Sequence, residues 1–97
     1  MKRNKRNILF HELIGLRVTI LRSRDPSLEG LSGTVYWETS RTLWIRVNSK
    51  VVKVLKNGSI FAFELPGGSI ARVKGEELLG RPEERAARMR WYKGAGA

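Results

Sequence analysis

The sequence predicts a single small domain of the mainly-β class, an antiparallel barrel with a short helical segment at each end. Apolar residues alternate with polar ones through several short segments, the pattern of strands with one buried face. Turn-forming residues separate these segments, and the alternation gives way to helix-like spacing only near the two ends of the chain. Because 97 residues supply enough apolar surface for only one core, we expect one barrel domain, over residues 8–75.

The amino-terminal residues divide into two parts. Met1–Asn7 is basic and has no apolar pattern, so we expect a flexible arm over residues 1–7. Ile8–Ile14 places its four aliphatic side chains near helical spacing, which predicts a short helical turn at one end of the barrel.

The first two strands are predicted over Leu16–Leu21 and Leu31–Glu38, where the apolar residues recur at every second position. Pro26 ends the first segment because its ring restricts the backbone before it. Gly33 lies inside the second segment and predicts a bulge or sharp bend. Trp37 has the parity of the apolar residues in its strand, so we expect it in the core.

The third and fourth strands are predicted over Thr42–Val47 and Val51–Lys56. A tight turn at Thr39–Arg41 joins the second strand to the third as a hairpin. The parity of the third strand leaves Trp44 on the face away from the core. Asn57-Gly58 ends the fourth strand and is the strongest hairpin signal in the chain, because both residues tolerate positive φ.

Two further strands and a helix complete the prediction. Ile60–Leu65 is a fifth strand, Pro66–Gly68 interrupts it, and Ser69–Lys74 is a short sixth strand. Residues 76–97 are expected to form a carboxy-terminal helix and tail, with the helix over Pro82–Lys93, because proline suits a first helical position. Five to six twisted strands with this spacing indicate an SH3-like, Sm-like or OB-like barrel.

Charge gives the strongest functional signal. The chain has 19 Lys and Arg against 9 Asp and Glu, a formal charge of +10 and an isoelectric point near 10.9. Such a surface attracts nucleic acid or an anionic membrane. The apolar runs are far shorter than the roughly 20 residues that span a bilayer, and Ile8–Leu16 is too interrupted for a secretory signal. We therefore expect a cytoplasmic protein that binds nucleic acid.

The residues needed for catalysis are sparse. The chain has no cysteine, one histidine, His11, and no spacing of carboxylates typical of an acid pair or a metal site. We expect His11 to pack or cap locally, and neither glycine pair is followed by the Lys-Ser or Lys-Thr of a phosphate loop. A small nuclease that uses His11 is the competing enzyme hypothesis.

The basic residues are the candidate RNA contacts, because they exceed their acidic neighbours and phosphate groups are their natural ligands. RNA is favoured over DNA since no helix motif for the major groove is present. The candidates are Lys2, Arg3, Lys5, Arg6, Arg22, Arg24, Arg41, Arg46, Lys53 and Lys56. Trp44, as an exposed aromatic, is expected to contact a base or a partner protein.

Four segments together resemble archaeal ribonuclease P protein component 1. Their order and spacing extend over most of the chain, and they are His11–Leu16 (HELIGL), Leu28–Val35 (LEGLSGTV), Glu38–Leu43 (ETSRTL) and Arg81–Arg85 (RPEER). The glycine turn within LEGLSGTV is also similar to one in ribosomal barrel proteins. A ribosomal or Sm-type RNA-binding barrel is therefore the alternative.

The resemblance implies an Sm-like barrel that acts as an RNA-binding subunit of ribonuclease P in tRNA 5′-end maturation. It implies that the ribonuclease P RNA performs the cleavage with magnesium, that this chain binds no cofactor, and that pre-tRNA is contacted only indirectly. It also implies a zinc-ribbon protein subunit as partner. Separately, the Lys-rich edge residues oppose ring assembly, so we expect the isolated chain to be monomeric. The expected contacts with that partner are Ile8, Leu9, Leu13, Trp44, Met89 and Trp91.

Overall fold

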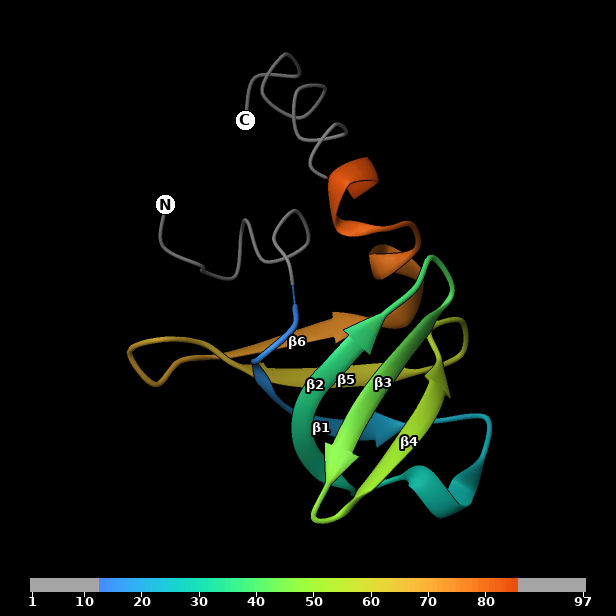
Figure 1. The fold of residues 1–97 in the computed structure, drawn as a ribbon, viewed down its shortest axis with the longest axis vertical. Coiled ribbons are helices and arrows are strands. Elements are labelled where there is room, and N and C mark those ends of the chain that lie inside the picture. The colour runs from blue at the N-terminus through green and yellow to red at the C-terminus, as the bar shows by residue number, and fades with distance from the viewer. Residues whose placement is uncertain (1–12, 86–97) are drawn as a thin grey trace.

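Six antiparallel strands form one strongly curved sheet in the order β4-β3-β2-β1-β5-β6 (Figure 1). The computed structural model describes residues 13–85. Within those residues β4 and β6 are edge strands that do not pair with each other, so the sheet is barrel-like but open. The elements are β1 (Arg17–Arg22), 3₁₀-helix η2 (Pro26–Leu28), β2 (Ser32–Glu38), β3 (Thr42–Val47), β4 (Lys50–Leu55), β5 (Ile60–Glu64), β6 (Ile70–Lys74) and 3₁₀-helix η3 (Gly75–Leu78).

The core lies on the concave side of this sheet. The inward side chains alternate along each strand, as the period-two pattern predicts, and they are buried except for Val47 and Val52, which are partly buried against the core. Phe61 and Phe63 contribute the largest apolar side chains, with ring centroids 5.9 Å apart. Leu13 and Leu78, from outside the strands, are fully buried in the same core.

The predicted bulge in the second strand is present but lies elsewhere. Val35 pairs with Ile45 and Trp37 pairs with Trp44, so the extra residue is Tyr36. Gly33 serves a different purpose, because a Cβ atom there would lie 2.1 Å from the carbonyl oxygen of Arg46. Glycine at this position allows β2 and β3 to approach closely.

The turn at Asn57-Gly58 is present, but the hairpin predicted from it is wrong. Gly58 has φ of +85°, and the N–H of Ser59 donates to the carbonyl of Lys56 at 3.1 Å. The chain then leaves β4 and crosses to β1, where β5 pairs in antiparallel register. Val18 pairs with Phe63 there, so the apolar faces of β5 and β1 join in one core.

The helices predicted at the two ends fall largely outside residues 13–85. Residues 82–85 are helical, in agreement with the predicted start at Pro82. At the other end, the N–H of Leu16 donates to the carbonyl of Leu13 at 3.1 Å in a turn. No helix among the described residues is long and apolar enough to cross a membrane.

Candidate nucleic-acid interface

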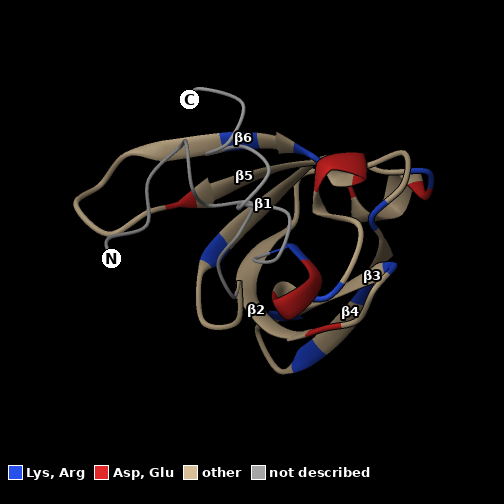
Figure 2. Cartoon of the chain, turned by 90° about the horizontal axis from the view of Figure 1, so that it is seen from above, with Lys and Arg blue, Asp and Glu red and all other residues tan. Residues whose placement is uncertain are grey.

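Five of the six predicted RNA contacts that the structure describes are exposed, and four of them lie in two regions of the surface. Figure 2 marks the positions of Lys and Arg along the chain. Arg22 is the last residue of β1, Arg24 lies in the loop that follows, and Arg41 is in the β2–β3 hairpin. Arg46 and Lys53 are on the outer face of β3 and β4. Lys2, Arg3, Lys5 and Arg6 lie outside the described residues.

One region is a pocket that brings together Arg24 and Arg41. It has a volume of about 380 Å³ and is also lined by Leu55, Asn57 and Leu79. The end of β1, the β2–β3 hairpin, the end of β4 and the segment after η3 each contribute to it. Neither arginine has a carboxylate within ion-pair distance among residues 13–85, so both charges are available to an anion.

The second region, the β2–β4 outer face, combines aromatic rings with cations. It is formed by Tyr36, Trp37, Trp44, Arg46 and Lys53. The Arg46 guanidinium lies 5.0 Å from the ring centre of Tyr36, and the Lys53 ammonium lies 5.7 Å from that of Trp44. Both distances are typical of cation–π contacts. The indole N–H of Trp44 donates to Thr42 Oγ1 at 3.1 Å, which fixes the ring on a half-buried site.

The prediction that Trp37 belongs to the core is wrong. Its side chain is 54% exposed, and it lies beside Trp44 across β2 and β3. The physical reason is the bulge at Tyr36, because one extra residue reverses the direction of every side chain after it in β2. The same reversal turns Glu38 inward, where only 6% of it is exposed.

The prediction that Lys56 contacts RNA is also contradicted. Lys56 is fully buried, and its Nζ donates to Glu38 Oε2 at 2.8 Å. The same ammonium donates to the backbone carbonyls of Thr39 and Leu78, each at 2.8 Å, and to that of Gly80 at 3.1 Å. Burial lowers the pKa of Lys56, and its hydrogen bond to Glu38 opposes that shift.

Arg85 completes a buried cluster with Lys56 and Glu38. Its Nη1 donates to Glu38 Oε2 and, at 2.7 Å, to the carbonyl of Gly80, while its Nη2 donates to Glu38 Oε1 at 3.2 Å. The Glu38 carboxylate therefore lies between two buried cations. The cluster joins β2, the turn after β4 and the helical residues 82–85, so its role in this fold is to fasten the carboxy-terminal segment to the sheet.

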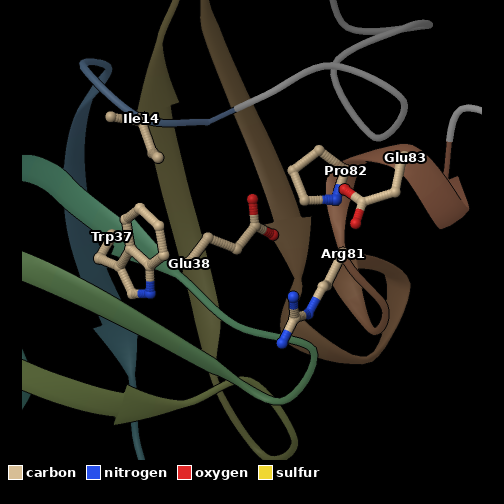
Figure 3. A pocket seen from close by; sticks show the side chains of 6 residues that line it. All are labelled: Ile14, Trp37, Glu38, Arg81, Pro82 and Glu83. Carbon is tan, nitrogen blue, oxygen red and sulfur yellow. The ribbon is translucent and has the colours of Figure 1, made fainter.

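A third feature is a pocket of about 430 Å³ beside the cluster (Figure 3). Ile14 and Trp37 lie on one side of it, and Arg81, Pro82 and Glu83 lie on the other.

Among the residues predicted to bind a protein partner, Trp44 lies on the adjoining outer face. Leu13 is fully buried in the core, so the prediction that it contacts a partner is contradicted.

The remaining predicted partner contacts, Ile8, Leu9, Met89 and Trp91, lie outside the described residues, as does His11. Within residues 13–85 no group of three or more His, Asp or Glu side chains is placed to hold a metal ion.

Comparisons with known proteins connect this site to one family. The family model described as ribonuclease P/MRP, subunit p29, matches residues 6–88. The ribonuclease P protein component 1 of Hyperthermus butylicus is 48% identical over 97 residues, which cover 99% of this chain and 87% of that protein. The corresponding protein of Pyrococcus furiosus is 46% identical over 90 residues, covering 93% and 70%.

A solved structure agrees with the sequence matches. Mth11, described as a homologue of the human RNase P protein Rpp29, superposes with a TM-score of 0.59 at 42% sequence identity. The match covers 77% of this chain and 97% of that one. Together these similarities favour the ribonuclease P resemblance over the ribosomal and Sm-type alternatives.

Proposed function

Because this chain belongs to the ribonuclease P/MRP subunit p29 family, and is thereby a ribonuclease P subunit involved in tRNA processing, we propose that it contributes by binding RNA. In this proposal the chain supplies no catalytic group. The ribonuclease P RNA performs the phosphodiester cleavage and uses magnesium, and pre-tRNA is contacted only indirectly. The protein binds no cofactor of its own and works in the cytoplasm.

The observation that carries the proposal is the convergence of Arg24 and Arg41 in one pocket without a carboxylate partner among residues 13–85. Exposed cations on β3 and β4 extend the positive surface, and the formal charge of the chain is +10. Phosphate groups bind such guanidinium groups through charge-assisted hydrogen bonds.

The proposal includes the zinc-ribbon ribonuclease P protein subunit as a partner. Support comes from the apolar walls that Ile14, Trp37 and Pro82 give to the 430 Å³ pocket, since aromatic side chains are enriched at protein interfaces. The isolated chain is proposed to be monomeric. Both edge strands carry exposed basic side chains, Lys50 and Lys53 on β4 and Arg72 and Lys74 on β6, which oppose edge-to-edge pairing.

Reconstitution of ribonuclease P from its RNA and protein subunits tests the proposed function. Omitting this chain is expected to raise the magnesium concentration needed for pre-tRNA cleavage, because its cations no longer stabilise the folded RNA. Cleavage rates measured across a magnesium titration, with and without the chain, give the comparison. An unchanged magnesium requirement together with unchanged cleavage would contradict the proposal.

The basic arm gives a separate prediction. Replacing Lys2, Arg3, Lys5 and Arg6 with alanine is expected to lower the dependence of RNA affinity on salt. Each phosphate contact that is lost reduces the slope of log K against log salt by about 0.7–0.9. Affinities measured by filter binding between low and moderate salt give this slope. An unchanged slope would remove the arm from the RNA contacts.

A further inference from the structure

We propose that the pocket between Arg24 and Arg41 binds one unpaired nucleotide of RNA, with both guanidinium groups on its phosphate. This inference rests on the proposed RNA binding and assigns one place where that binding occurs. The pocket is distinct from the β2–β4 outer face, which carries the aromatic rings.

The two arginines are positioned by backbone contacts, although they lie far apart in the sequence. The N–H of Lys56 donates to the carbonyl of Arg41 at 2.9 Å, which holds the β2–β3 hairpin against the turn after β4. Arg24 packs on the same turn, since a Cβ atom at Gly58 would lie 2.7 Å from its Nε atom. The turn therefore supports both residues, and Gly58 leaves the space that Arg24 occupies.

The charge around the pocket suits a single phosphodiester. The carboxylate of Glu76 lies near the turn that supports Arg24, and it accepts the N–H of Gly58 at 2.7 Å. This hydrogen bond is the main reason that the pKa of Glu76 is lowered, and the charge of Arg24 contributes least. Glu76 therefore offsets the two cations only in part, which leaves positive charge for one phosphodiester.

The remaining walls suit a nucleobase. Leu55 is 51% exposed and Leu79 is half-buried, so together they present an apolar surface to one face of a base. Asn57 adds an exposed amide that can donate and accept hydrogen bonds at a base edge. The volume of about 380 Å³ is within the range of small-ligand sites.

An unpaired nucleotide fits this arrangement better than a duplex. In A-form RNA the bases are stacked, and proteins contact the backbone and the shallow groove. A base can reach Leu55 and Leu79 only when it is turned out of the stack. Arginine is also the suitable cation, because its planar guanidinium bonds two phosphate oxygens at once, whereas lysine acts as a point charge.

The test measures binding of fluorescein-labelled hexauridylate to the full chain by anisotropy. Arg24→Ala and Arg41→Ala are each expected to weaken binding about tenfold. The double variant is expected to lose less than the product of the two, because both side chains share one phosphate. Arg24→Lys and Arg41→Lys are expected to restore only part of the affinity. The matched control is Arg72→Ala, an exposed arginine on β6, which should change affinity by less than about twofold.

Two further measurements address the class of ligand. In nuclear magnetic resonance spectra, hexauridylate is expected to shift the Arg24 and Arg41 Nε–H signals and the Asn57 amide signals. Inorganic phosphate is expected to shift the arginine signals alone. Glu76→Gln is expected to strengthen hexauridylate binding, because it removes the opposing charge. A blunt RNA duplex of equal charge should displace hexauridylate poorly.

The outcomes separate this inference from the proposed function. If hexauridylate binds but the Arg24 and Arg41 variants match the Arg72 control, the pocket assignment is wrong while RNA binding stands. The pocket assignment is also wrong if the double variant loses the full product of the two single losses in affinity. It is equally wrong if the RNA duplex displaces labelled hexauridylate as well as single-stranded RNA does. Failure of the chain to bind either hexauridylate or ribonuclease P RNA would contradict the proposed function itself.

Discussion

Replacing Glu38 with alanine is expected to lower the free energy of unfolding by about 3–5 kcal/mol, because it removes the carboxylate that lies between two buried cations. The Glu38 side chain is 1% exposed, and the Nζ atom of Lys56 lies 2.8 Å from its Oε2. The Arg85 guanidinium contacts the same carboxylate. The carbonyls of Leu78 and Gly80 accept hydrogen bonds from both cations, but a carbonyl carries no full charge.

Urea denaturation at neutral pH gives the measurement, and the chain provides a matched control. Glu64 forms an ion pair with Arg17 at 3.7 Å, with both side chains more than half exposed. Glu64→Ala is expected to cost at most about 1 kcal/mol, since water screens such pairs. Glu38→Gln retains the shape of the side chain but not its charge, so it should also be strongly destabilising. Equal losses for Glu38→Ala and Glu64→Ala would contradict the role assigned to the cluster.

The strand pattern can be predicted from the sequence because period-two alternation records which face is buried. All six strands are confirmed, and each boundary lies within one residue of the prediction. Alternation carries no information about where a strand gains an extra residue, so the predicted position of Trp37 is wrong. The connection after Asn57-Gly58 escapes prediction because a turn signal gives no information about which strands pair.

The candidate site is predictable only in part. The cationic residues are evident from composition, and exposure follows from strand parity for Arg46 and Lys53. The meeting of Arg24 with Arg41 depends on which loops share one end of the sheet, a property of topology. Sequence reasoning places Lys56 on the surface because lysine is rarely buried. Its burial depends on Glu38, which is 18 residues from Lys56 in the sequence and 47 residues from Arg85.

Replacing Gly75 with alanine is the second large effect that we expect, with a loss of about 3 kcal/mol or more. A Cβ atom at Gly75 would lie 1.6 Å from the carbonyl oxygen of Lys56 and 2.5 Å from its carbonyl carbon. Both are backbone atoms, so no side-chain rotation relieves the clash. The start of η3 must move away from the turn after β4, which breaks the hydrogen bond from the Gly75 N–H to the Ser59 carbonyl at 2.8 Å.

This displacement should also disturb the buried cluster and the arginine pocket, because Leu78 and Leu79 follow directly after the shifted residues. Thermal denaturation is expected to show a midpoint lower by at least about 12 °C. Gly67→Ala is the control, since Gly67 has φ of +94° but a Cβ atom there would meet no atom within 4 Å. Its cost is backbone strain of about 1–2 kcal/mol. If Gly75→Ala destabilises the chain no more than Gly67→Ala does, the close approach of Gly75 to the backbone of Lys56 does not require glycine at this position.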